Sequence, residues 1–144
     1  MSLENYAQLK LEGQLCFPMY AASKEIIRKY KPYLEALDLT YTQYITMMVL
    51  WEKKQVNVKE LGASLFLDSG TLTPLLKKLE AKGYITRGRS KVDERNLEIV
   101  ITEAGENLRE QAAHIPYEMA KMIQLSHEEA FQLYNLLYKL LGSL

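Results

Sequence analysis

The single cysteine, Cys16, is the residue of this chain with the clearest capacity for chemistry. A cysteine thiolate is a nucleophile, and peroxides oxidise it to a sulfenic acid. Pro18 lacks a backbone N–H and fits best in the first turn of a helix, so we expect a regular helix to begin near residues 14–17. That start places Cys16 at a helix N-terminus, where the thiolate form is favoured. A lone cysteine is most often an inert buried side chain, so Cys16 alone does not decide between the two interpretations.

Other reactive constellations are missing from the sequence. Two histidines, His114 and His127, and one cysteine do not make a metal-ligand cluster. We find no glycine-rich phosphate loop and no supported Ser-His-Asp arrangement. We therefore expect neither a metal nor a cofactor, and we do not expect an enzyme.

The whole-chain composition fits a single globular domain over residues 1–144. Hydrophobic residues make up 48% of the chain, which is enough for a core, and 25% of residues are charged. The formal net charge is zero, yet the stretch 77–95 holds seven basic and three acidic residues, a local charge of +4. A neutral total therefore hides one basic region, as expected of a surface that binds a polyanion.

The sequence favours a cytoplasmic protein. The longest apolar run, around residues 44–51, is far shorter than the ~20 residues that span a bilayer. The first residues lack the basic start and apolar core of a signal peptide. One cysteine cannot form an internal disulfide, which suits a reducing compartment. We expect no membrane association.

The stretch 68–83 predicts a short helix with its own start and stop. Asp68 and Ser69 can each cap an N-terminus, and Gly83 can supply the left-handed residue that ends a helix. Four leucines form one apolar stripe at helical spacing: Leu72, Leu75, Leu76 and Leu79. The opposite face carries hydroxyls and then cations: Thr71, Thr73, Lys77, Lys78 and Lys82. Such a helix suits a DNA major groove, although on its own it is more simply a solvated surface helix.

The neighbouring segments favour the DNA-binding interpretation. Thr40 or Thr42 can cap a helix that runs through residue 51, and Asn57 can cap a short helix over 58–65. Two short helices joined by a few residues, the second with a polar face, are typical of a helix-turn-helix. Period-2 patterns then predict strands at 84–87 and 97–101, joined by a charged loop over 88–96.

This hairpin has the character of a DNA-binding wing. Its basic loop can enter a minor groove, whose negative potential attracts arginine. Asp93 lies two residues before Arg95 and can orient its guanidinium through a charge-assisted hydrogen bond. An exposed hairpin whose charges only keep it soluble is the alternative. The predicted DNA-binding residues of the helix and wing are Asp68, Ser69, Thr71, Thr73, Lys77, Lys78, Arg87, Arg89, Asp93 and Arg95.

The two ends of the chain predict dimerisation helices, at about 9–37 and 103–144, around a DNA-binding part at about 40–102. Pro32 predicts a kink or break in the first of these helices, and Pro116 predicts one after the helix that Thr102 caps. The last helix, after Ser126, is apolar almost all round, so it needs burial on several sides. We therefore expect a mainly α fold with a small β-hairpin, paired as a two-fold homodimer on successive half-sites of double-stranded DNA.

The sequence resembles the MarR family of winged-helix repressors over nearly its whole length. The family-wide motifs are Asp68-Ser-Gly-Thr-Leu-Thr-Pro-Leu-Leu-Lys-Lys-Leu-Glu, Gly83-Tyr-Ile-Thr-Arg and Asp93-Glu-Arg-Asn. More specific segments look like the organic-hydroperoxide sensor subgroup, OhrR: Leu9-Lys-Leu-Glu-Gly-Gln-Leu-Cys-Phe, Tyr20-Ala-Ala-Ser-Lys-Glu, Lys29-Tyr-Lys-Pro-Tyr and Leu39-Thr-Tyr-Thr-Gln-Tyr.

This resemblance implies a redox-sensing repressor that acts as a homodimer on a pseudo-palindromic operator. In that subgroup peroxide oxidises the matching cysteine, here Cys16, and tyrosines of the partner subunit hydrogen-bond to it. The matching tyrosines are Tyr30 and Tyr41, with Tyr20 a weaker match. With no second cysteine in the chain, a low-molecular-weight thiol or a backbone nitrogen must react with the sulfenic acid.

Three other functions compete with this one. A MarR-type repressor can be released by a small aromatic ligand, with Cys16 incidental. A thiol peroxidase would use Cys16 catalytically, but the chain has no resolving cysteine and no arginine near Cys16 in sequence. A winged helix can also serve protein contacts alone, and binding to DNA that weakens steeply with salt would exclude that possibility.

Overall fold

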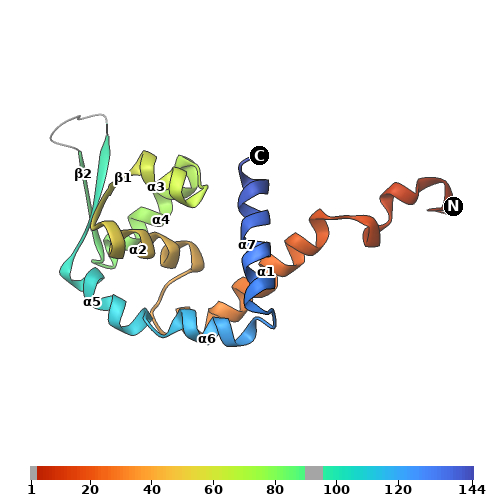
Figure 1. The fold of residues 1–144 in the computed structure, drawn as a ribbon. Helices are drawn as coiled ribbons and strands as arrows, with labels where there is room; N and C mark the ends of the chain where they lie inside the picture. Colours follow the sequence, from red (N-terminus) through yellow and green to blue (C-terminus); the bar gives the residue numbers. More distant parts are fainter. Residues whose placement is uncertain (1–2, 90–95) are drawn as a thin grey trace. The chain divides into compact units, whose positions relative to one another are not determined.

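The structure, a computed structural model, describes residues 3–89 and 96–144 (Figure 1). The chain divides into two compact units, Met1–Ala113 and His114–Leu144, and each is described by itself. It stays a prediction that the chain forms a single domain with dimerisation helices at its two ends. No helix in the described ranges has both the length and the apolar character to cross a membrane.

The first unit starts with two short 3-10 helices, η1 (Leu3–Leu9) and η2 (Leu11–Gly13), followed by α1 (Cys16–Glu35). Cys16 is the first residue of α1 and Pro18 lies in its first turn, which confirms the start expected from the proline. The helix runs on through Pro32 to Glu35, so there is no break at this proline, and a kink there stays a prediction.

Side-chain caps fix the next three helices: α2 (Tyr41–Lys53), α3 (Val58–Leu65) and α4 (Ser69–Ala81). Thr40 caps α2 with a capping box, in which Gln43 N donates to Thr40 Oγ1 and Thr40 N donates to Gln43 Oε1. Asn57 accepts from Glu60 N at the start of α3, and Asp68 accepts from Thr71 N at the start of α4. The caps predicted for these helices are thus confirmed.

A three-stranded antiparallel sheet in the order β1-β3-β2 completes the wing. Strand β2 (Ile85–Arg89) pairs with β3 (Leu97–Ile101) from Ile85 opposite Ile101 to Arg89 opposite Leu97. The predicted hairpin is confirmed, and its first strand reaches two residues further than expected. Strand β1 (Gln55–Asn57) was not predicted, because three residues are too few to show a period.

The first unit ends with α5 (Glu103–Ala112), which Thr102 caps as predicted. Thr102 Oγ1 accepts from Gly105 N and donates to the carbonyl of Gly83, 2.6 Å away. This one hydroxyl joins the end of α4 to the start of α5. The core of the unit consists of buried apolar side chains from α1 to α5 and the sheet: Leu34, Leu37, Leu39, Tyr44, Met47, Leu50, Val56, Leu61, Leu72, Leu76, Leu79, Ile85, Ile99 and Leu108.

The second unit contains α6 (Ile115–Met122) and α7 (His127–Leu141). Pro116 lies in the first turn of α6, which confirms the predicted interruption after α5. Ser126 caps α7 with a capping box to Glu129. No residue of α7 is buried, so its large apolar side chains face solvent in the single chain.

A candidate DNA-binding surface and thiol site

The start of α4 is held by Asp68. Its Oδ1 accepts a 2.7 Å hydrogen bond from Thr71 N, and hydrogen bonding to Thr71 lowers the pKa of the Asp68 carboxyl. The carboxylate therefore stays charged at neutral pH and stabilises the positive end of the helix. In the structure Asp68 caps the N-terminus of α4, and direct contact of Asp68 with DNA stays a prediction.

The exposed face of α4 matches the predicted groove face in all but one residue. Leu72, Leu75, Leu76 and Leu79 are buried, and this fixes the opposite side outward. Thr71, Thr73, Lys77 and Lys78 are exposed there. Thr73 Oγ1 donates to the carbonyl of Ser69 at 2.8 Å, so its oxygen lone pairs remain able to accept from a donor on a base.

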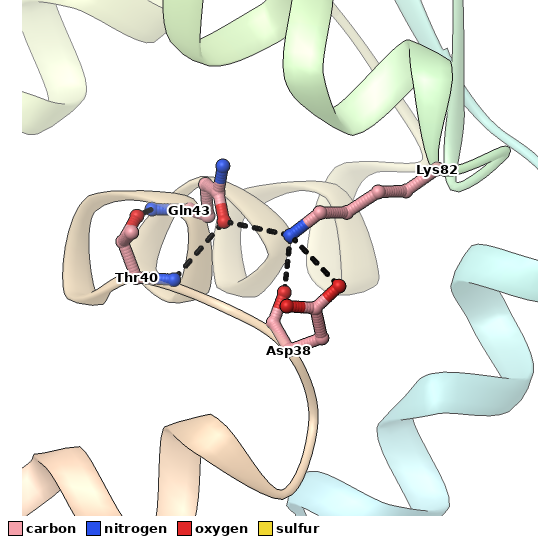
Figure 2. A network of polar contacts seen from close by, with 4 residues as sticks. All are labelled: Asp38, Thr40, Gln43 and Lys82. Atoms are coloured by element: carbon pink, nitrogen blue, oxygen red, sulfur yellow. Dashed lines mark hydrogen bonds and ion pairs between the residues drawn. The ribbon is translucent and has the colours of Figure 1, made fainter.

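Lys82 is the exception to that face. Its ammonium turns back onto the segment between α1 and α2, where it donates to the carbonyl of Asp38 (Figure 2). It also lies 3.4 Å from Asp38 Oδ2 and 3.4 Å from Gln43 Oε1. Helical spacing placed Lys82 with the groove-facing lysines, but it follows the last residue of α4, where the chain has begun to turn.

Arg87 has a similar structural partner at the base of the wing. Its Nη2 donates to Glu80 Oε1 at 3.1 Å, and its backbone N–H donates to Glu80 Oε2, also at 3.1 Å. Arg87 lowers the pKa of the Glu80 carboxyl, chiefly by side-chain hydrogen bonding, so the pair stays ionised at neutral pH. The Arg87 side chain is only 19% exposed. It joins β2 to α4, and contact between Arg87 and DNA stays a prediction.

The other predicted wing residues are Arg89, Asp93 and Arg95. Arg89 is the last residue of β2, pairs in register with Leu97 and is exposed. Asp93 and Arg95 fall outside the described residues. Their roles on DNA remain those that the sequence predicts.

Cys16 is exposed at the first residue of α1. Leu15, the residue before it, makes no side-chain capping hydrogen bond, and the first turn holds no acidic side chain. The thiol is therefore open to a reactant in the single chain.

Two of the three predicted sensor tyrosines come together. The ring centroids of Tyr30, from α1, and Tyr41, the first residue of α2, lie 5.0 Å apart. Tyr20 is 62% exposed and is not part of this pair; the ammonium of Lys24 lies 5.5 Å from its ring centroid. Within the described residues no hydrogen bond joins Cys16 to Tyr30 or Tyr41, and the role of these tyrosines toward the cysteine of a partner subunit stays a prediction.

The tyrosine pair belongs to a larger aromatic cluster. The ring centroid of Tyr44 lies 5.8 Å from that of Tyr30, 6.2 Å from that of Tyr41 and 6.3 Å from that of Trp51. Burial raises the pKa of all three tyrosines, with Tyr41 adding to the effect on Tyr30, and raises that of Tyr44 to about 12. These phenols keep their protons and so remain hydrogen-bond donors. Tyr44 was not singled out from the sequence; its place three residues after Tyr41, on the same helix, is the signal that it shares the cluster.

Metal binding finds no support in the structure. Within residues 3–89 and 96–144, no group of three or more histidine, cysteine, aspartate or glutamate side chains is placed to hold an ion.

Comparison with known proteins identifies the family. The family model described as transcriptional regulator SarA/Rot matches residues 28–112. An organic hydroperoxide resistance transcriptional regulator of Bacillus subtilis (strain 168) is 47% identical over 143 residues, covering 99% of this chain and 97% of the relative. The HTH-type transcriptional regulator SarZ of Staphylococcus saprophyticus is 50% identical over 123 residues, covering 85% of this chain and 84% of the relative.

A solved structure agrees with these relatives. Reduced AbfR bound to DNA has a TM-score of 0.79 and 31% identity, with 96% of this chain and 97% of that chain covered. All of these proteins are regulators rather than enzymes, which decides against the thiol peroxidase. The chain therefore belongs to the SarA/Rot family of transcriptional regulators and is a DNA-binding protein of the MarR winged-helix type that its sequence resembles.

Proposed function

We propose that the protein is a homodimeric repressor that releases its operator when an organic hydroperoxide oxidises Cys16. The observation that carries the proposal is that one chain holds both an exposed thiol, at the first residue of α1, and the packed, protonated phenols of Tyr30 and Tyr41. The likeness to an organic hydroperoxide resistance transcriptional regulator and to reduced AbfR bound to DNA supports the same function. A repressor of this kind acts on the chromosome, in the cytoplasm.

The exposed apolar surface at both ends of the chain supports the proposed dimer. Phe131, Tyr134 and Leu136 of α7 and Leu15 and Phe17 beside the thiol are all exposed. A second copy that covers these side chains removes them from water, with a favourable free energy of roughly 25 cal/mol for each Å² of apolar surface buried. A two-fold dimer also presents two α4 helices to the half-sites of a pseudo-palindromic operator of double-stranded DNA.

The chemistry at Cys16 is a two-electron oxidation. The thiolate attacks the terminal oxygen of the hydroperoxide, the O–O bond breaks, and the departing alkoxide takes a proton to become an alcohol. Sulfur is oxidised to the sulfenic acid while the peroxide is reduced. A low-molecular-weight thiol then condenses with the sulfenic acid, which forms a mixed disulfide and releases water.

Tyr30 and Tyr41 of one subunit serve the thiol of the other. Their phenols donate hydrogen bonds to the thiolate, and the raised pKa of each phenol keeps it protonated and able to donate. Oxidation replaces this small anionic acceptor with a bulkier group, so the contacts between the subunits change. The two α4 helices then lose the spacing that the operator requires.

Fluorescence anisotropy with the DNA upstream of the protein's own gene tests this function. Reduced protein is expected to bind, and cumene hydroperoxide with a small thiol is expected to release it. Cys16→Ser should bind equally well and stay bound. A Cys16→Ser protein that still releases DNA on oxidation would show that Cys16 is not the sensor, and a monomer at micromolar concentration by light scattering would contradict the dimer.

A second candidate function rests on a pocket of about 650 Å³ in the first unit. Apolar side chains and cations line it together, among them Ile27, Leu34, Lys24, Arg28 and Lys78. Its size and lining suit a small aromatic carboxylate, which would make Cys16 incidental. Release of DNA from Cys16→Ser by millimolar benzoate would favour this function, and continued binding would argue against it.

A further inference from the structure

A network of polar contacts connects the end of α4, the helix predicted to enter the DNA groove, to the start of α2 (Figure 2). Lys82, directly after α4, donates to the carbonyl of Asp38 and lies 3.4 Å from both Asp38 Oδ2 and Gln43 Oε1. These partners are 44 and 39 residues away in sequence. The ammonium therefore bridges two elements that the backbone joins only through a long path.

The acceptors of Lys82 are held in place. Gln43 is 3% exposed, and its Oε1 also accepts from Thr40 N at 3.0 Å in the capping box of α2. Asp38 adopts a left-handed backbone with φ of 53°, between the buried side chains of Leu37 and Leu39. A carbonyl fixed by its buried neighbours and an amide fixed by a helix cap give the lysine a defined position, unlike most surface ion pairs.

The same first turn of α2 carries one of the sensor tyrosines. Tyr41 follows the cap residue Thr40, and its ring packs on Tyr30 at 5.0 Å and on the buried Tyr44 at 6.2 Å. A shift of the Tyr41 ring therefore acts on the turn that holds both the capping box and the acceptors of Lys82.

The other end of the network is the end of α4, the helix predicted to contact DNA. Lys82 N donates to the carbonyls of Lys78 and Glu80, and Gly83, with φ of 82°, turns the chain toward β2. Lys82 thus lies between the end of α4 and the start of β2, three residues after the fully buried Leu79. A displacement of its ammonium acts directly on the end of α4.

We propose that Lys82 is a positioning residue that couples the tyrosine pair to the recognition helix, so that the change at Cys16 reaches α4 through the contacts of Lys82 with Asp38 and Gln43. The inference rests on the proposed function, because it concerns how the oxidation signal reaches DNA. It assigns Lys82 a role distinct from that of the exposed lysines on the groove face, Lys77 and Lys78.

The test measures operator affinity by anisotropy in the reduced and the oxidised state and takes the ratio of the two Kd values. Loss of a charge near DNA weakens both states alike and cancels in this ratio, whereas loss of coupling lowers the ratio itself. Allosteric ratios commonly lie at about 5–150-fold. We expect Lys82→Met to bring the ratio at least about fivefold closer to one.

Lys54→Met provides the matched control. Lys54 Nζ lies 2.6 Å from Glu106 Oε1, so this variant also removes a lysine–carboxylate pair from α2, but at its other end and toward α5. The ratio for Lys54→Met should equal that of the wild type. Thermal unfolding of both variants shows whether their stabilities are comparable.

Asp38→Asn sharpens the assignment to this contact. It keeps the carbonyl acceptor and suits a left-handed backbone, so a smaller fall in the ratio is expected than for Lys82→Met. In the Lys82→Met background the Asp38→Asn change should add nothing, because its partner is gone. Additive effects of the two changes would contradict the proposed contact.

The outcomes separate the two proposals. A wild-type ratio near one overturns the proposed function. A wild-type ratio well above one that Lys82→Met leaves unchanged overturns the coupling role of Lys82 alone. A ratio that falls equally in Lys82→Met and Lys54→Met overturns it as well, because the effect is then a general loss of support for α2.

Discussion

The interior of the first unit and the surface of α7 use the same kinds of residue in opposite ways. Leu50, Leu61 and Leu79 are completely buried among α2, α3 and α4. Leu136, Phe131 and most of the other apolar residues of α7 are exposed, and none is buried. The first unit thus has a closed hydrophobic core that is made by one chain. The apolar surface of α7 is left for another surface to cover, as the proposed dimer does.

A pair of leucine substitutions gives the largest test of this contrast. Leu79→Ala should lower the free energy of unfolding by about 2–5 kcal/mol, because it leaves a cavity in a closed core. That loss should be the same at every protein concentration in urea unfolding followed by circular dichroism.

Leu136→Ala is the matched change on α7, where the leucine is 63% exposed. If α7 packs in a dimer, its cost should appear as weaker association, so the midpoint of unfolding should depend more strongly on protein concentration. A large, concentration-independent loss for Leu136→Ala would show that α7 packs within its own chain.

Two glycines test how tightly the first unit is packed. A Cβ at Gly105 would meet the carbonyl oxygen of Tyr84 and would lie 2.9 Å from the Ile101 side chain. Gly105→Ala should therefore destabilise the protein by about 1–3 kcal/mol, as overpacked sites do. Gly13, before α1, has open space around it, so Gly13→Ala should change stability by less than about 0.5 kcal/mol. Calorimetry that found equal effects would show that the first unit is loosely packed at α5.

The smallest effect concerns the phenol of Tyr44. Burial raises its pKa to about 12, so between about pH 10 and 12 the folded chain keeps a proton that the unfolded chain has lost. Stability should therefore be unaffected below about pH 10 and fall as the pH rises toward 12. Tyr44→Phe should remove the part of the tyrosinate absorbance that appears last as the pH is raised. An unchanged titration curve would assign that late proton to another tyrosine.

The local signals of the sequence predicted most of the fold. Thr40, Asn57, Thr102 and Ser126 each cap the helix that follows them, because a short polar side chain before an apolar stripe acts within three residues. Strand β1 was missed because its partner lies more than forty residues away and its own length carries no period.

The site was predicted less completely than the fold, because several of its contacts join residues that lie far apart in sequence. Helical spacing correctly placed Thr71, Thr73, Lys77 and Lys78 on the exposed face of α4. It could not show that Lys82 turns to Asp38, because that contact is decided by how the chain folds back on itself. The family resemblance named Tyr30 and Tyr41 as sensor residues but did not predict that their rings pack together. The two lie eleven positions apart in sequence with a helix boundary between them, so only the structure shows that contact.

Trp51 gives the molecule an optical reporter of its own. It is the only tryptophan in the chain, and its indole N–H donates to the carbonyl of Gly105 at 2.8 Å, while its ring meets Tyr44 edge-on. Intrinsic fluorescence excited in the indole band therefore originates at one place, where α2 meets α5 beside the tyrosine cluster. Without any attached dye, its emission can follow the aromatic cluster in real time as peroxide is added or as DNA binds.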